Sequence, residues 1–329
     1  MPEKTLIEAI HDAMDEEMAR DPSVVLLGED VGLRGGVFRA SAGLIEKYGE
    51  ARVIDTPLAE SSIAGVAIGM ALNGLRPIAE MQFADFSFPA FNQIQSEAAR
   101  MYYRSNGGWK VPMVVRMPYG GGPGVHGALY HSQSVEAFYA HIPGLKVVLP
   151  SFPYDAKGML KAAIRDDDPV IFLEHKKAYR SVRQEVPDGD YTVPLGPAEV
   201  RREGRHVTIY SYGFLLHESL RAAEQLKGEG IECTVVDVRS LKPLDKKTIV
   251  EAAKLTGRVL IVHEDNVSFG AGAEIAAVIA EEALFHLDAP VRRLCGPDVP
   301  GIGFNHVYEV EFTPDAARIA AAARELARY

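Results

Sequence analysis

The stretch Asp55–Ala67, Asp-Thr-Pro-Leu-Ala-Glu-Ser-Ser-Ile-Ala-Gly-Val-Ala, joins the end of a predicted strand to the start of a predicted helix. Val53 and Ile54 are typical of a buried strand, Pro57 ends it, and a helix rich in glycine and alanine follows. Glu60 therefore lies where a strand gives way to a helix, the edge at which parallel α/β folds bind ligands. A glutamate there is more often a first-turn residue that interacts with free helix amides, so position alone favours that structural interpretation over a catalytic one.

Composition excludes several classes of function. The chain has 329 residues, of which 47% are hydrophobic and 24% charged, as in ordinary soluble proteins with room for two domains. Its net charge of −10 argues against a nucleic-acid-binding or anionic-membrane surface, because such surfaces concentrate Lys and Arg. An acidic face that meets a basic protein remains compatible with this charge.

The two cysteines, Cys233 and Cys295, lie in apolar strand-like runs and have neither a disulfide framework nor metal-ligand spacing. We expect both to be buried thiols. No apolar run reaches the roughly 18 residues that a membrane span needs, and the N-terminus lacks the apolar core of a signal peptide. The sequence therefore predicts a cytoplasmic protein, or an organellar one whose leader has been removed.

Strands and helices alternate along the first half of the chain. Thr5 and Glu8 have the spacing of a capping box, and the apolar residues that follow predict a helix over 5–20. Strands are predicted at 24–27, 53–54, 78–83, 111–117, 145–149 and 170–173, with helices at about 84–104 and 154–165. Such alternation predicts an α/β fold, a parallel sheet with helices on both faces.

The second half repeats the alternation after a proline-marked connection. Strands are predicted at 206–211, 231–237, 258–263 and 290–294, and helices at 214–228, 245–255, 271–286 and 314–327. We therefore expect domains at 1–180 and 206–329, joined by a linker at 181–205. The run His263-Glu264-Asp265-Asn266 follows a predicted strand; because consecutive strand residues point to opposite faces, a solvated turn is favoured there over a metal site.

Two further places carry polar side chains of possible chemical use. Glu29 follows the strand 24–27 and precedes a glycine-rich loop, although it could simply be a solvated loop acid. His126 and His131 follow the run Gly120–Gly124, and an imidazole at the end of a mobile segment is a candidate for proton transfer. The glycine run lacks the Gly-Lys-Ser/Thr ending of a phosphate-binding loop and carries little weight as one.

Several segments together resemble one family, the beta chains of thiamine diphosphate-dependent 2-oxo acid dehydrogenase components. The resemblance covers nearly the whole chain in order. It is carried by Gly28-Glu29-Asp30-Val31, Arg52–Glu60, Gln82-Phe83-Ala84-Asp85-Phe86, His131-Ser132-Gln133-Ser134, Pro143–Val148 and Tyr154–Gly158. It implies a transketolase-like pyrimidine-binding domain followed by a smaller α/β transketolase C-terminal domain.

The resemblance also implies roles for particular residues. The position of Glu60 matches the glutamate that hydrogen-bonds the aminopyrimidine of thiamine diphosphate and drives proton transfer from the cofactor. Glu29, Leu58, Gln82 and Phe86 match residues that line the aminopyrimidine. His131 matches a histidine near the reacting centre, where it would assist transfer to the lipoyl group, and His126 ranks lower because only part of the family has it.

Metal ions and partner chains follow from the same resemblance. A K⁺ site of some relatives would fall on an acidic turn and its neighbours, where an empty turn is an equal alternative: Met113, Ala163, Ile164, Asp166 and Asp168. The Mg²⁺-binding Gly-Asp-Gly segment is missing, since Tyr191 follows Gly189-Asp190. The diphosphate and Mg²⁺ are therefore expected on an alpha subunit, in a heterotetramer of two alpha and two beta chains. The C-terminal domain would bind the basic subunit-binding domain of a lipoyl acyltransferase.

The sequence leaves more than one substrate, and more than one class of protein, to be considered. The segments Gly127–Gln133 and Phe83–Phe86 look most like branched-chain enzymes acting on substrates such as 2-oxoisovalerate, whereas Phe172–Lys176 looks equally like pyruvate or acetoin relatives. A non-catalytic binding subunit on the same fold would be expected to lack Glu60 or His131, and both are present. A one-chain transketolase is disfavoured by length and by the missing Mg²⁺ segment.

Overall fold

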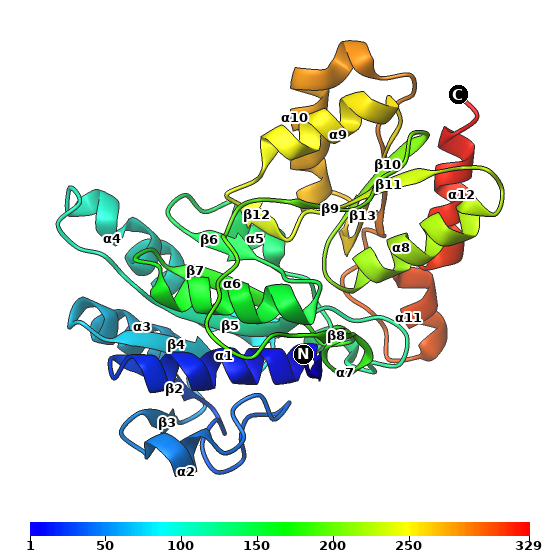
Figure 1. Cartoon of the computed structure of the whole chain (residues 1–329). Coiled ribbons are helices and arrows are strands. Elements are labelled where there is room, and N and C mark those ends of the chain that lie inside the picture. Colours follow the sequence, from blue (N-terminus) through cyan, green and yellow to red (C-terminus); the bar gives the residue numbers. More distant parts are fainter. The chain divides into compact units, whose positions relative to one another are not determined.

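The computed structural model describes residues 1–329, which form two compact units (Figure 1). Unit 1 comprises Met1–Tyr119 and Phe138–Leu195, and unit 2 comprises Gly120–Ala137 and Gly196–Tyr329. A glycine-rich segment from the first half of the chain thus groups with the second half. The expected division into 1–180, 181–205 and 206–329 stays a prediction, because grouping by proximity does not test which parts fold independently.

Unit 1 is built on a parallel sheet, as the alternating pattern predicts. Its strands follow the order β6-β7-β5-β4-β2-β3, and each neighbouring pair is parallel. A separate antiparallel pair joins β1 to β8. The strands of unit 1 are β1 (Glu3–Thr5), β2 (Val24–Gly28), β3 (Val53–Asp55), β4 (Arg76–Glu80), β5 (Val114–Tyr119), β6 (Lys146–Val148), β7 (Val170–His175) and β8 (Arg183–Glu185).

The helices of unit 1 pack on this sheet, and α1 and α6 lie side by side across it (Figure 1). Their apolar sides and the fully buried strands β2, β5 and β7 form the core. The helices are α1 (Leu6–Arg20), α2 (Leu44–Tyr48), α3 (Glu60–Leu72), the 3₁₀ helix η1 (Ala84–Ala90), the π-helical segment η2 (Gln93–Ala98), α4 (Ala99–Arg104), α6 (Pro153–Arg165) and α7 (Ala178–Ser181); α5 (Glu136–Ala140) begins in unit 2 and ends in unit 1.

The predicted capping box at the start of α1 is confirmed. Thr5 Oγ1 accepts a hydrogen bond from the Glu8 backbone N–H (3.4 Å), and Glu8 Oε2 accepts one from the Thr5 backbone N–H (2.7 Å). The two side chains thus satisfy donors that the first helical turn leaves free. The Thr5 hydrogen bonds outweigh burial and lower the pKa of the Glu8 carboxyl.

Thr5→Ala is expected to lower the free energy of unfolding by about 1 kcal/mol, because it removes the capping acceptor. Urea unfolding followed by circular dichroism measures the change. Thr5→Ser keeps the hydroxyl and is the matched control. Equal stability of the alanine and serine variants would contradict a stabilising role for the cap.

The single helix expected over 84–104 is instead divided into three segments. Pro89 lies inside η1, and a proline in a helix lacks the N–H donor and clashes with the preceding turn. A π-helical segment and the short α4 then complete the stretch. The preceding strand also ends early, at Glu80 rather than at residue 83, so that Gln82 and Phe83 leave the sheet before η1 begins.

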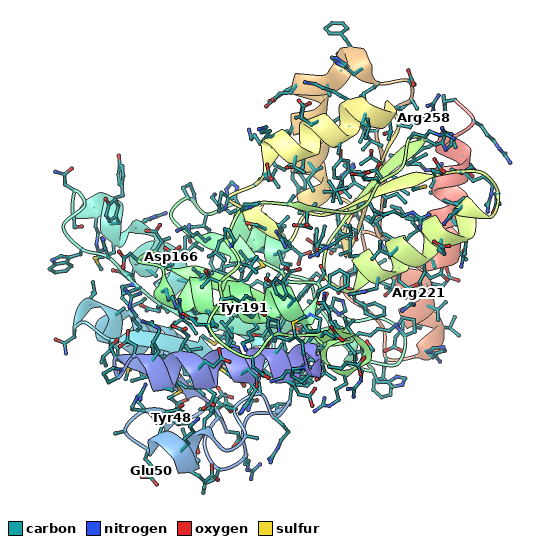
Figure 2. The ribbon with its side chains drawn as sticks, viewed as in Figure 1. Tyr48, Glu50, Asp166, Tyr191, Arg221 and Arg258 are labelled. Carbon is teal, nitrogen blue, oxygen red and sulfur yellow. The ribbon has the colours of Figure 1, made fainter.

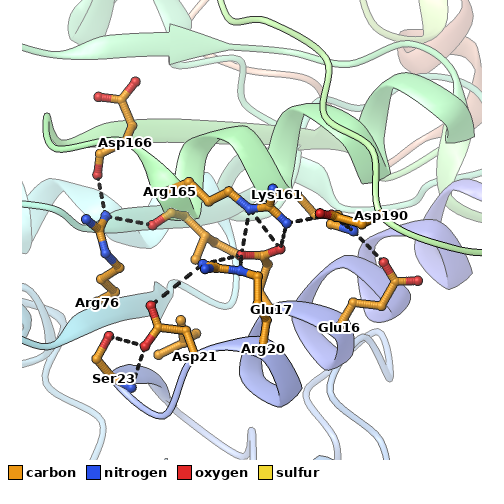
Figure 3. Close-up of polar contacts among 12 residues, drawn as sticks. Glu16, Glu17, Arg20, Asp21, Ser23, Arg76, Lys161, Arg165, Asp166 and Asp190 are labelled. Carbon is orange, nitrogen blue, oxygen red and sulfur yellow. Dashed lines mark hydrogen bonds and ion pairs between the residues drawn. The ribbon is translucent and has the colours of Figure 1, made fainter.

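Charged side chains join α1 to α6 beside the core (Figure 3). Glu17 is fully buried and accepts two hydrogen bonds to Oε1 from Arg165, from Nη2 at 2.5 Å and Nε at 3.1 Å, while Arg20 bonds its Oε2 at 2.8 Å. Lys161, almost wholly buried, pairs with Glu16 at 2.6 Å. Each buried charge therefore has an opposite partner, which a low-dielectric environment requires.

Unit 2 contains a five-stranded sheet of order β14-β13-β10-β11-β9. All neighbours are parallel except β9, which pairs antiparallel with β11. Because β9 lies within the predicted linker, that stretch is not wholly an unstructured connection. The strands of unit 2 are β9 (Glu199–Arg202), β10 (Val207–Ser211), β11 (Cys233–Asp237), β12 (Ser240–Lys242), β13 (Val259–Asn266) and β14 (Arg292–Gly296).

Helices cover both faces of this sheet, α8 and α12 on one and α9 and α10 on the other (Figure 1). The four long helices lie where the sequence predicts them, and α11 is an additional element. No helix in the chain is both long and apolar enough to cross a membrane. The helices of unit 2 are η3 (Ala128–Tyr130), α8 (Phe214–Lys227), α9 (Lys246–Thr256), α10 (Ala271–Ala283), η4 (Leu284–His286), α11 (His306–Phe312) and α12 (Ala316–Leu326).

Candidate active site

Glu60 is the first residue of α3, five positions after the end of β3. Its side chain is largely buried, with the residue 9% exposed. Helix α3 has 13 residues, and a carboxylate in its first turn interacts favourably with the positive end of the helix dipole. The local structure thus holds a carboxylate at the carboxyl edge of the sheet, as the sequence predicts.

Glu29 lies at the same edge because of the strand register. It follows Gly28, which is paired with Asp55 of β3 on one side and with Glu80 of β4 on the other. The Glu29 side chain is buried, so the sequence-based alternative of a solvated loop acid is wrong. Burial raises the pKa of Glu29, and the negative charge of Glu60 raises it further, which places the two carboxylates within electrostatic reach of each other.

One oxygen of Glu29 is left without a partner. Its Oε1 is buried and accepts no hydrogen bond, although the Ala59 backbone N–H donates to this carboxylate. A buried polar atom without a partner costs free energy and marks a place where a ligand can bind. The pair Glu29 and Glu60 is therefore suited to a ligand that presents nitrogen-bound hydrogens.

The other residues predicted to line the cofactor have different surroundings. Gln82 donates to Asp30 Oδ2 over 3.4 Å, and Asp30 is itself one of the charges that raise the pKa of Glu29. Phe86 packs edge-on against Phe83, with ring centroids 5.4 Å apart. Leu58, two positions before the buried Glu60, is 80% exposed. Its apolar surface is available to a planar ligand.

The structure also contains a buried ion cluster that the sequence pattern does not predict. Arg116 of β5 binds both oxygens of Glu174 at 2.7 Å and reaches Glu80 Oε2 at 2.6 Å. Tyr179 donates to Glu174 Oε2 at 2.6 Å. Burial alone would lower the pKa of Arg116, but the two carboxylates raise it, so the guanidinium stays charged. The available signal was an arginine inside an otherwise apolar strand.

A chain of aromatic contacts joins this cluster to Phe86. Tyr179 contacts Phe38 at a centroid distance of 5.1 Å, Phe38 contacts Phe83 at 5.5 Å, and Phe83 contacts Phe86. Close packing transmits displacements between neighbours. The ion cluster thus supports Phe86 from within the core of unit 1.

His131 belongs to unit 2, immediately after η3, and is half-buried. The segment before it contains Gly120, Gly122 and Gly124 with positive φ angles, which glycine adopts without steric cost. His126 lies in the same segment and is exposed. The role that the resemblance implies for His131 stays a prediction.

The run His263–Asp265 corrects one expectation. All three residues lie in β13 and are buried, so the favoured solvated turn is wrong. Strand β13 lies between β14 and β10 and is covered by helices on both faces, which buries alternate residues equally. Burial lowers the pKa of His263 to about 4 and raises that of Asp265 to about 6. Of the two cysteines expected to be buried, Cys233 is buried and Cys295 is only half-buried.

The acidic turn predicted for K⁺ already contains cationic side chains. Arg76 donates to the carbonyls of Ile164 (3.0 Å) and Asp166 (2.8 Å) (Figure 3). Lys146 pairs with the carboxylates of Asp166 (2.6 Å) and Asp168 (3.1 Å). Burial alone would lower the pKa of Lys146, but the two aspartates raise it. The carboxylates are therefore neutralised by the protein itself.

The remaining predicted ligands have backbone partners. The Met113 carbonyl accepts from Val170 N at 2.9 Å, and the Ala163 carbonyl accepts from Asp166 N at 3.2 Å. Asp166 directly follows α6 (Figure 2). No group of three or more His, Cys, Asp or Glu side chains in the chain is arranged to hold a metal ion. The K⁺ site at these residues stays a prediction.

Comparison with known proteins agrees with this architecture. The sequence matches the family "Transketolase, pyrimidine binding domain" over residues 3–182 and "Transketolase, C-terminal domain" over residues 196–319. A solved structure described as "Split gene transketolase, inactive beta4 tetramer" superposes with a TM-score of 0.81 at 27% identity, covering 98% of both chains.

Curated relatives cover almost the whole length. The 2-oxoisovalerate dehydrogenase subunit beta of Bacillus subtilis is 58% identical over 98% of both chains. The pyruvate dehydrogenase E1 component subunit beta of the same organism is 50% identical over 91% of both. The mitochondrial 2-oxoisovalerate dehydrogenase subunit beta of Dictyostelium discoideum is 49% identical over 94% of this chain and 83% of its own. From the paired transketolase domains and these identities, we conclude that this chain belongs to the family of 2-oxo acid dehydrogenase beta subunits.

Proposed function

We propose that this chain catalyses, together with an alpha subunit, the thiamine diphosphate-dependent oxidative decarboxylation of a branched-chain 2-oxo acid such as 2-oxoisovalerate. The observation that carries the proposal is the buried pair Glu29 and Glu60 with its unpartnered oxygen. The 58% identity to a 2-oxoisovalerate dehydrogenase beta subunit supports the branched-chain substrate. The 50% identity to a pyruvate dehydrogenase beta subunit keeps pyruvate as the second candidate.

The residues present fit the aminopyrimidine of thiamine diphosphate. This ring offers an amino group and a ring nitrogen that can be protonated, and two neighbouring carboxylate acceptors suit both. Leu58 and Phe86 supply apolar and aromatic surface for a flat ring, and Gln82 supplies an amide. When bound, the cofactor supplies a carbon nucleophile and an electron sink for decarboxylation.

In this proposal, the residues of this chain bind and transfer protons. Glu60 would hold the proton of the pyrimidine ring nitrogen, which requires an ionisable carboxylate and not merely a hydrogen-bond acceptor. Glu29 would accept a second hydrogen bond from the ring, through the oxygen that lacks a partner. His131 would give or take a proton during acylation of a lipoyl group on the acyltransferase.

Partner chains complete the enzyme. The chain lacks the Gly-Asp-Gly segment that binds Mg²⁺ and diphosphate, so an alpha subunit would provide that part in a heterotetramer of two alpha and two beta chains. The split-gene transketolase described as inactive as a beta4 tetramer supports this dependence. The net charge of −10 suits a basic subunit-binding domain of the acyltransferase.

A panel of 2-oxo acids tests the proposed substrate. The chain, co-expressed with its alpha subunit, is assayed by dye reduction with 2-oxoisovalerate, pyruvate and no substrate. We expect kcat/KM for 2-oxoisovalerate to exceed that for pyruvate by at least tenfold, because the two additional methyl groups allow discrimination of about this size. A preference for pyruvate would select the second candidate, and no turnover of either acid would overturn the function.

A further inference from the structure

Glu309 of α11 binds the glycine-rich segment that precedes His131, although about 180 residues separate them in the sequence. Its Oε2 accepts the backbone N–H of Gly124 at 3.1 Å, and its Oε1 accepts that of His126 at 2.6 Å. The glutamate is 1% exposed, so water does not compete for these bonds. Both carboxylate oxygens are thus used on one short stretch of backbone.

Two imidazoles adjoin the same carboxylate. His126 Nδ1 lies 3.4 Å and His306 Nδ1 3.5 Å from Glu309 Oε2, and both rings are exposed. Burial alone would raise the pKa of Glu309, but the amides of Gly124 and His126 and the histidine rings outweigh burial and lower it. Glu309 is therefore ionised at neutral pH, and charge-assisted hydrogen bonds of this kind are stronger than neutral ones.

The segment held by Glu309 needs external support. His126 and Ala128 have φ angles of 54° and 51°, a region that costs a residue with a side chain on the order of 1 kcal/mol or more. Apart from the three-residue η3, the segment contains no regular structure of its own. Its conformation must therefore be imposed by neighbours.

A second carboxylate holds the same segment at its two ends. Glu264 Oε1 accepts the Gly121 backbone N–H at 2.9 Å and the Ser134 hydroxyl at 3.0 Å. Because Gly121 precedes His131 and Ser134 follows it, Glu264 fixes the base of the loop while Glu309 fixes its middle. His131 lies between these two attachments.

We propose that Glu309 is a positioning residue for the loop 120–134, and that it sets the backbone from which His131 acts on the lipoyl group. Glu309 itself touches no reacting atom. The inference rests on the function proposed above, because it assigns the loop to the acylation step. A displacement of about 1 Å at a reacting group can cost about 100-fold in rate.

The test separates the two half-reactions in the complete alpha–beta enzyme. Glu309→Gln and Glu309→Ala are assayed for dye-linked decarboxylation and for acylation of a free lipoyl domain. We expect the alanine variant to lose about 10- to 100-fold in kcat of acylation with KM for the lipoyl domain unchanged, and less than threefold in the dye-linked rate. The glutamine variant, which keeps one acceptor oxygen, should lose less than alanine.

Glu311→Gln is the matched control, because Glu311 lies on the same helix with a 70% exposed side chain that pairs with Arg318. It should leave both half-reactions unchanged. An acylation rate within threefold of wild type in Glu309→Ala, or an equal fall of both half-reactions in Glu309→Gln, would overturn the positioning role.

Amide hydrogen exchange distinguishes failure of this inference from failure of the proposed function. If the wild-type enzyme turns over no 2-oxo acid, the proposed function fails, yet Glu309→Ala should still increase exchange at residues 121–134 at least tenfold while α12 stays protected. Unchanged exchange in the loop would show that Glu309 does not hold it, whatever reaction the enzyme catalyses.

Discussion

Glu60→Gln in the alpha–beta enzyme is expected to lower the rate of 2-oxo acid decarboxylation by about 10³-fold, within the range that general acid–base groups contribute. Glutamine has nearly the same shape and keeps a hydrogen-bond acceptor, so the buried position at the start of α3 should tolerate it. It cannot exchange a proton near neutral pH. Steady-state dye reduction measures the loss, and thiamine diphosphate binding by calorimetry should change by less than tenfold.

Glu50→Gln provides the control for Glu60→Gln. Glu50 is exposed and lies on the loop between α2 and β3 (Figure 2). Its substitution removes the same charge from unit 1 without touching Glu29 or Glu60. A Glu60→Gln enzyme that retains a rate within threefold of wild type would show that Glu60 does not transfer the proton in the reaction.

Arg116→Met is expected to have the largest effect on stability. The substitution keeps most of the apolar volume but leaves Glu80 and Glu174 buried without their counter-charge. Breaking a buried ion pair from one side costs about 3–5 kcal/mol. Urea unfolding of the purified protein measures this loss, and Arg324→Met, which breaks an exposed pair with Glu229, should leave the unfolding midpoint unchanged.

The pH dependence of the Arg116→Met defect has a defined sign. Burial already raises the pKa of Glu80 in the folded protein, and Arg116 opposes that increase. Without the arginine the folded-state pKa rises further, so protonated Glu80 is favoured by folding and the stability it contributes is lost as pH rises through that pKa. The defect should therefore be smaller at pH 5.5 than at pH 7.5. A defect that grows on acidification would contradict this account.

The parts of the fold and of the site that depend on residues close together in the sequence could be predicted. Thr5 and Glu8 predict their capping box because both partners lie within one helical turn. Glu60 is placed by the strand, the proline and the helix around it. Glu29 reaches the same edge because the carboxyl ends of parallel strands lie together. The alternation of strands and helices in the sequence already predicts a parallel sheet.

The parts that depend on long-range contacts could not be predicted. Glu309 lies outside every predicted element and Glu264 follows a predicted strand, and only the fold brings them to the loop before His131. The prediction of a solvated turn at His263 was wrong for a related reason. The alternation of side chains along a strand places neighbours on opposite faces of the sheet, but it does not tell whether helices cover both faces. Arg116 was overlooked because its two carboxylate partners lie 36 and 58 positions away in the chain.

The central claim is that two chains share one cofactor site, in which Glu60 is the group that transfers the proton. The most direct test compares this chain alone with the alpha–beta complex. Both are supplied with thiamine diphosphate, Mg²⁺ and 2-oxoisovalerate, and decarboxylation is followed by dye reduction. We expect turnover from the complex and none from the isolated chain, because the chain lacks the Mg²⁺-binding segment. Turnover by the isolated chain at a rate comparable to the complex would contradict the shared site.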